Sequence, residues 1–80
     1  MVYFVYILRC VDGSLYTGFT SDLRRRLVEH RAGRGSRYVA SRLPVYLVHS
    51  EGFSSRRKAM AREREIKRLS KKKKEGLVGQ

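Results

Sequence analysis

Five polar side chains of this 80-residue chain stand on predicted strands or on the apolar stripes of predicted helices, at positions where packing residues are expected. They are Tyr6, Tyr16, Arg26, His30 and Glu63. Phenol hydroxyls, a guanidinium, an imidazole and a carboxylate are groups that bind anions, transfer protons or hold a metal ion. Whether they form one site depends on the elements that carry them.

Glu63 projects from the apolar side of a helix predicted over residues 56–69, between Ala59 and Ile66. A lone buried carboxylate is unfavourable unless a cation or a metal ion offsets its charge. Two interpretations follow. Either Glu63 forms a salt bridge with Arg26 or another arginine and has no other role, or it lines a cleft and holds a divalent cation through its oxygens.

A second predicted helix, over residues 23–31, shows the same anomaly. At about 100° per residue, its apolar stripe consists of Leu23, Arg26, Leu27 and His30. An arginine on this stripe is unfavourable unless it is paired. His30 is either a hydrogen-bonded histidine at the edge of the core or, together with Arg26, part of a functional site.

The tyrosines belong to a predicted β-hairpin. Residues 2–8 are β-branched and aromatic and form the first strand, and residues 14–18 form the returning strand. Tyr6 and Tyr16 lie on the two arms. Tyr3 lies on the face opposite Tyr6, and we expect it to serve packing alone.

The length of the hairpin turn decides whether the two tyrosines share a face. If residues 12–13 form a two-residue turn, the residue numbers of two residues paired across the strands add up to an odd number. Tyr6 and Tyr16 then face opposite ways. If residues 11–13 form the turn, with Gly13 in the left-handed region, the sum is even and both face the same way. The sequence fits either turn, so a shared site requires the longer one.

The remaining elements complete the order β-β-α-β-α. Residues 31–42 contain two glycines and are predicted to be irregular or briefly helical. Pro44 precedes a third predicted strand at residues 45–50, and Ser54 and Ser55 are candidate caps of the long helix. We expect one domain over residues 1–80, without a linker or an internal repeat.

The charge of the chain indicates a polyanionic partner. Nineteen Lys and Arg against seven Asp and Glu give a net charge of +12. Nucleic acid is the expected partner because binding phosphates releases counterions and needs no sequence readout. Ribosome-associated proteins and proteins of membrane surfaces share this composition. The lysine run at residues 71–74 is either a nucleic-acid contact or a solvated tail.

The only cysteine, Cys10, excludes an intrachain disulfide and a zinc site built from cysteines. It lies in an apolar run, so we expect a small buried hydrophobe rather than a nucleophile. The sequence contains no signal-peptide pattern and no apolar run of membrane-spanning length. We therefore expect a cytoplasmic protein without a membrane partner.

Taken together, these residues resemble the GIY-YIG nuclease superfamily, most closely its small single-domain bacterial members. The matching positions are Phe4-Val5-Tyr6, Tyr16-Thr17-Gly18, Arg26, His30 and the pattern A-x-x-R-E-x-x-I-K at residues 59–67, which contains Glu63. The resemblance covers nearly the whole chain. It departs from the family pattern where Phe4 and Val5 replace Gly-Ile, where Thr17 replaces Ile, where Phe19 replaces a lysine of several members, and in the absence of asparagine.

The resemblance implies an α+β fold, a small three-stranded antiparallel sheet flanked by helices, with or without a short extra helix. It also implies hydrolysis of phosphodiester bonds in DNA, or in RNA, with one divalent ion, Mg²⁺ or Mn²⁺. A structure-selective role in repair or recombination suits a chain without an appended recognition domain. The alternatives are a nucleic-acid-binding module on the same scaffold without efficient catalysis, and a structural basic protein in which Arg26 and Glu63 pair.

By position, the resemblance assigns Tyr6 and Tyr16 to the two motif tyrosines, Arg26 to the phosphate-binding arginine and Glu63 to the metal ligand. His30 stands where many members have His or Tyr. We hypothesise that Tyr6, near His30, takes a proton from water, and that Tyr16 orients water or phosphate; the exchanged assignment fits the same residues.

Overall fold

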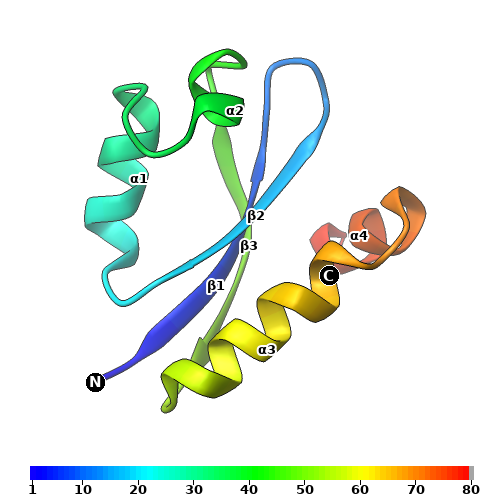
Figure 1. The fold of residues 1–80 in the computed structure, drawn as a ribbon. Coiled ribbons are helices and arrows are strands. Elements are labelled where there is room, and N and C mark those ends of the chain that lie inside the picture. Colours follow the sequence, from blue (N-terminus) through cyan, green and yellow to red (C-terminus); the bar gives the residue numbers. More distant parts are fainter. Residues whose placement is uncertain (80) are drawn as a thin grey trace.

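The computed structural model describes residues 1–79 and shows an α+β fold built on a three-stranded antiparallel sheet (Figure 1). The strands are β1 (Tyr3–Arg9), β2 (Leu15–Thr20) and β3 (Tyr46–Phe53), in the order β2-β1-β3. The helices are α1 (Leu23–Arg31), α2 (Arg37–Ala40), α3 (Arg56–Lys67) and α4 (Lys71–Val78). The expected fold class is confirmed, while Gln80, the last residue of the expected domain, lies outside the described residues.

Two short helices extend the predicted order. α2 forms within the segment predicted to be irregular or briefly helical, where the Ser36 hydroxyl accepts a hydrogen bond from the Val39 amide. α3 ends at Lys67, two residues earlier than predicted, and α4 begins at Lys71 because Ser70 caps it through the Lys73 amide. The lysine run is thus the first turn of a helix.

Helices cover both faces of the sheet, with α1 and α2 on one side and α3 and α4 on the other (Figure 1). The central strand β1 alternates between them: Tyr6 and Leu8 pack toward α1 and α2, and Val5 and Ile7 toward α3 and α4. Burial on both faces explains why the first strand is continuously apolar. Cys10 is buried in the α1 and α2 cluster, as expected.

The hairpin has the longer of the two turns. The Cys10 amide donates to the Ser14 carbonyl, the Gly13 amide donates to the Cys10 carbonyl, and Gly13 has φ +85°. Leu8 therefore pairs with Tyr16, and every β1–β2 pair sums to an even number. Tyr6 and Tyr16 share a face, which is the geometry that a common site requires.

The third strand is longer than predicted, because pairing with β1 extends through the polar residues at its end. Tyr3 pairs with Phe53, and Phe4 pairs with Gly52. Tyr3 packs in the α3 and α4 cluster, on the opposite face from Tyr6, which confirms its expected orientation. Among residues 1–79, no helix is long and apolar enough to cross a membrane.

Candidate active site

Tyr6 reaches the outer edge of the sheet by crossing the neighbouring strand at a glycine. Its side chain starts on the central strand, is 1% exposed, and lies opposite Gly18 of β2. A Cβ atom on Gly18 would lie 2.6 Å from the Tyr6 hydroxyl oxygen. Glycine at this position therefore leaves the space in which the hydroxyl sits.

His30 is the hydrogen-bond partner of that hydroxyl. It lies in the last turn of α1 with its ring fully buried, and its Nε2 lies 2.8 Å from the Tyr6 oxygen. The other face of the site is formed by Tyr16, whose ring packs edge-on against His30 at a centroid distance of 5.4 Å. The hydrogen-bonded histidine that the sequence allowed is present, and it joins the two tyrosines.

A second glycine shapes the histidine pocket. A Cβ atom on Gly35 would lie 2.5 Å from Nδ1 of His30. That nitrogen has no hydrogen-bond partner among residues 1–79. The backbone of Gly35 thus fixes the ring against Tyr6 without engaging its second nitrogen.

Arg26 brings a half-buried cation to the same place. Arg26 lies near the start of α1, and Asp22 caps this helix by accepting a hydrogen bond from the Arg25 amide. Nη1 of Arg26 lies 3.2 Å from Glu29, while its buried Nε has no partner among the described residues. The nearby Tyr6 hydroxyl is the main cause that raises the pKa of Arg26. The guanidinium therefore lies beside the Tyr6 hydroxyl with donor capacity to spare.

A small polar cleft opens in front of this cation. Its volume is about 240 Å³. The lining residues are Thr20, Ser21, Asp22, Arg25, Arg26 and Glu29. Together with the spare donors of Arg26, the cleft is suited to an anion such as phosphate.

The surroundings keep both Tyr6 and His30 uncharged near neutral pH. Burial raises the pKa of Tyr6, and the charges of Tyr16 and Glu63 act in the same direction, against the opposing effect of Arg26. Burial, with the nearby Arg26 cation, lowers the pKa of His30 below its ordinary value.

Glu63 approaches the site from α3, on the other face of the sheet. Its side chain is 18% exposed and forms an ion pair with Lys67, Nζ to Oε2 3.5 Å. The Arg26–Glu63 salt bridge that would make both residues merely structural is not formed, since Arg26 pairs with Glu29. Lys67, the ion-pair partner of Glu63, lines one hollow together with Tyr16, so Glu63 lies near the Tyr16 side of the site.

The donor set fits one kind of metal ion and not another. Residues 1–79 contain no group of three or more His, Cys, Asp and Glu side chains that could enclose an ion. Mg²⁺ usually keeps several waters and binds one or two carboxylates together with substrate phosphate. Glu63, partly exposed and held only by a flexible lysine, suits such a hydrated ion and does not suit a fully enclosed one.

The predicted residues thus lie together around the outer edge of β2. Tyr6, Tyr16, Arg26 and His30 form a continuous cluster on the α1 side, and Glu63 flanks it from α3. Sequence reasoning missed the spacing roles of Gly18 and Gly35. Two signals were available, the glycine that ends Tyr16-Thr17-Gly18 and the glycine-rich segment after α1.

Known proteins share this fold and sequence. The model of the GIY-YIG catalytic domain matches residues 2–76. A UPF0213 protein of Natronomonas pharaonis is 54% identical over 76 residues, which cover 95% of this chain and 89% of that protein. A UPF0213 protein of Streptococcus pneumoniae serotype 4 is 43% identical over 77 residues, covering 96% of this chain and 78% of that protein.

Two solved structures agree with these matches. The solution NMR structure of a UPF0213 protein from Bacillus halodurans has a TM-score of 0.65 at 48% identity, covering 99% of this chain and 84% of that one. An NMR structure of an E. faecalis protein has a TM-score of 0.67 at 38% identity, with the same coverage. Fold and site therefore define a domain of the nuclease superfamily. The chain belongs to the GIY-YIG family, and it is similar to the UPF0213 proteins of bacteria and archaea.

Proposed function

We propose that this protein is an endonuclease that hydrolyses phosphodiester bonds in DNA with one divalent ion, Mg²⁺ or Mn²⁺, at Glu63. The observation that carries the proposal is the Tyr6 hydroxyl, which crosses β2 over Gly18 and meets His30 beside Arg26, a residue that also lines a polar cleft. Membership of a nuclease superfamily and a charge of +12 support the same assignment.

Arg26 binds the phosphate. Its unpartnered Nε and its remaining N–H groups can donate to non-bridging oxygens, with Glu29 holding one end of the guanidinium. Charge-assisted hydrogen bonds of this kind strengthen as negative charge develops on the phosphate and as water is excluded. Arg26 thus stabilises the transition state more than the bound substrate.

Tyr6 and His30 move the proton. Water attacks phosphorus, and the bond from phosphorus to the leaving oxygen breaks. Because the raised pKa of Tyr6 leaves the phenol protonated, it accepts the proton of water while its own proton passes to Nε2 of His30. The lowered pKa of His30 keeps that nitrogen free to accept near pH 7. The leaving oxygen takes a proton from solvent.

Glu63 holds the metal ion, and Tyr16 orients the reacting groups. When bound, the ion supplies Lewis acidity toward a phosphate oxygen. Lys67, 3.5 Å from the carboxylate, is able to turn toward substrate phosphate. Tyr16, packed against His30 at the edge of β2, directs its hydroxyl toward water or phosphate. We expect structure-selective cleavage, in repair or recombination, since the domain carries few elements beyond those of the site.

Nicking of supercoiled plasmid by the purified protein, with Mg²⁺ or Mn²⁺, tests the proposal. We expect nicking by the wild type, and at least about a 100-fold loss in Glu63→Gln while DNA binding is retained. Glu65→Gln is the matched control, because Glu65 lies on the same helix, is 64% exposed and pairs with Arg62. Full activity in Glu63→Gln contradicts the metal assignment. DNA binding without metal-dependent nicking by the wild type supports the binding-module alternative instead.

A further inference from the structure

A second hollow, beside Tyr16, plays no part in the proton transfer described above. Its volume is about 280 Å³. Its lining residues are Leu15, Tyr16, Thr17, Tyr38, Lys67 and Lys74. Since α2 contributes Tyr38 from one face of the sheet and α3 and α4 contribute the lysines from the other, the hollow straddles the outer edge of β2. The lining combines two aromatic rings with two cations and includes no carboxylate.

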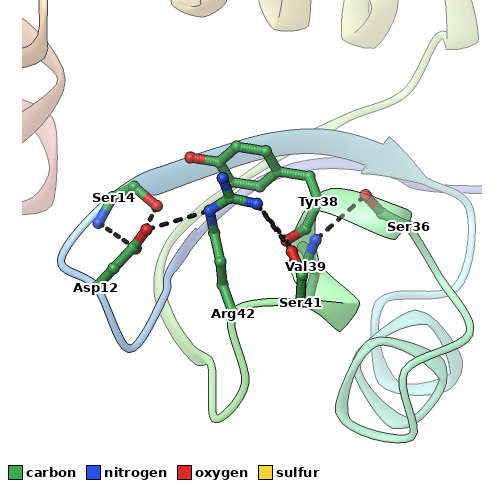
Figure 2. A network of polar contacts seen from close by, with 7 residues as sticks. All are labelled: Asp12, Ser14, Ser36, Tyr38, Val39, Ser41 and Arg42. Carbon is green, nitrogen blue, oxygen red and sulfur yellow. Dashed lines mark hydrogen bonds and ion pairs between the residues drawn. The ribbon is translucent and has the colours of Figure 1, made fainter.

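Tyr38 is not explained by packing. It is 39% exposed and belongs to neither buried cluster. Its ring lies 6.1 Å from that of Tyr16, 26° from parallel, and the guanidinium carbon of Arg42 lies 3.7 Å from its centroid. Figure 2 shows the Tyr38 ring and the Arg42 guanidinium stacked beside the hairpin turn.

The arginine of this stack is held in place before any ligand arrives. Its Nε donates to Asp12 at 3.1 Å, and its Nη1 donates to the Tyr38 carbonyl at 3.0 Å and to the Ser41 hydroxyl at 2.9 Å (Figure 2). The Arg42 carbonyl also accepts from the Val11 amide. Tyr38 and Arg42 together form a partly exposed, cationic aromatic surface, which we call the Tyr38 platform.

A cationic groove with exposed aromatic rings is the arrangement that binds unpaired nucleotides. The rings accept any base by stacking, and the lysines bind the phosphates. A base within a duplex already has both faces stacked, so it does not fit a side-chain platform unless it leaves the helix.

We propose that this hollow binds one unpaired nucleotide of the DNA substrate, with its base against the Tyr38 platform and its phosphate at Lys67 and Lys74. The subsite adjoins the proposed active site through ring contacts, from Tyr38 to Tyr16 and from Tyr16 to His30. This placement next to the cut rests on the proposed function. It makes DNA with unpaired nucleotides at the cleavage point the preferred substrate class.

Binding of fluorescent DNA to the Glu63→Gln protein tests the subsite without relying on cleavage. In this background we expect Tyr38→Leu to weaken binding of a single-stranded oligonucleotide by about 5-fold or more. Binding of the corresponding duplex is expected to change less than about 2-fold, because duplex contacts are electrostatic. Tyr38→Phe should bind as Tyr38 does, since the ring is retained. Equal losses for single strand and duplex overturn the proposal.

Two matched controls separate stacking from general surface effects. Tyr46→Leu removes another exposed tyrosine, 61% exposed on β3 at the opposite edge of the sheet, and should leave single-strand binding unchanged. Lys74→Gln should reduce the slope of log binding constant against log salt concentration for single-stranded DNA by about 0.7. Lys72→Gln, outside the hollow, should leave this slope unchanged. A loss in Tyr46→Leu equal to that in Tyr38→Leu contradicts the platform.

If Tyr38→Leu folds poorly, base stacking is tested by changing the DNA instead of the protein. Oligonucleotides that carry abasic sites should bind the Glu63→Gln protein about 5-fold or more weakly than intact ones, because no base is left to stack. Unchanged binding of abasic DNA overturns the subsite. If the expected losses occur but the wild type cuts no DNA, the subsite stands and the proposed hydrolysis fails.

Discussion

The two faces of the sheet bury different kinds of side chain. On the α3 and α4 face, Val5, Ile7, Ala59 and Ile66 are fully buried and apolar. On the α1 and α2 face, the deepest groups include the Tyr6 hydroxyl and the His30 ring, and buried nitrogens of His30 and Arg26 have no partner among residues 1–79. Unpartnered buried polar groups cost stability. The first face supplies the apolar cluster that holds the domain together, with Glu63 of α3 beside it, and the second holds the Tyr6 hydroxyl and the His30 ring in position.

The arginines show the same contrast. Arg62 of α3 donates Nε and Nη2 to the two oxygens of Glu51, at 2.8 and 3.0 Å, and also pairs with Glu65. Arg26 of α1 has one ion pair, with Glu29 at 3.2 Å, and retains a buried Nε without a partner among the described residues. A saturated arginine is structural, whereas one with spare donors can take an anion.

The largest stability effect should come from the apolar face. Ile66→Ala removes a fully buried side chain from the cluster with Val5, Ile7 and Ala59. We expect the free energy of unfolding to fall by about 2–5 kcal/mol. Cleavage per folded molecule should persist, because Ile66 packs in the cluster with Val5, Ile7 and Ala59, whereas Tyr6 packs in the cluster on the other face. Denaturant unfolding and nicking rates, measured on the same preparation, separate the two effects. A slower nicking rate in a fully folded Ile66→Ala protein contradicts the separate roles of the two faces.

A smaller stability effect with a large functional one should come from Gly18→Ala. The new methyl group meets the Tyr6 hydroxyl at 2.6 Å and its Cζ at 2.8 Å, so the phenol has to move. Overpacking of this kind costs about 1–3 kcal/mol of unfolding free energy. Because the hydroxyl leaves His30, nicking should fall by at least about 10-fold.

Gly76→Ala is the matched control for Gly18. No heavy atom lies within 4 Å of the site for its Cβ, and the residue is inside α4. Alanine is the better helix former by about 1 kcal/mol, so stability should be kept or raised. Equal nicking activities of Gly18→Ala and Gly76→Ala would show that nicking does not need the space that Gly18 leaves for the Tyr6 side chain.

The smallest effect is a pH dependence of stability from His30. Its pKa is lowered in the folded protein from 6.5, so the unfolded chain binds the proton more readily. As pH falls below about 6.5 the unfolded state gains protons first, and stability falls; above that pH the contribution is fully present. The difference in unfolding free energy between pH 7 and pH 5 should shrink in His30→Gln. An unchanged difference in His30→Gln contradicts the burial of a neutral ring.

The local elements were predictable because their signals are short-range. The apolar stripe placed Arg26 and His30 toward the sheet, and Ser55 caps α3 as expected. The hairpin was predictable except for the length of its turn, since Gly13 suits both forms. Its three-residue form follows from hydrogen bonds between Cys10 and Ser14, together with φ +85° at Gly13.

Contacts that only the folded chain brings about could not be predicted from the sequence. Gly35 is 5 residues from His30 in sequence, yet no periodic pattern states that its missing side chain makes room for the imidazole. Tyr38 and Arg42 lie in a segment predicted as irregular or briefly helical, and only the fold brings them to the hairpin turn and to Tyr16. The pairing of Glu63 with Lys67 rather than with Arg26 was equally undetermined, because both partners fit the charge pattern.

One measurement tests the reactive cluster directly: the rate of Mg²⁺-dependent plasmid nicking by Tyr6→Phe, beside Tyr3→Phe. The first change removes only the oxygen that lies 2.8 Å from His30, and the second removes a hydroxyl from the opposite face. If Tyr6 transfers the proton of water, its variant should lose about 100-fold or more, and Tyr3→Phe should match the wild type. Wild-type nicking by a folded Tyr6→Phe protein would contradict the account.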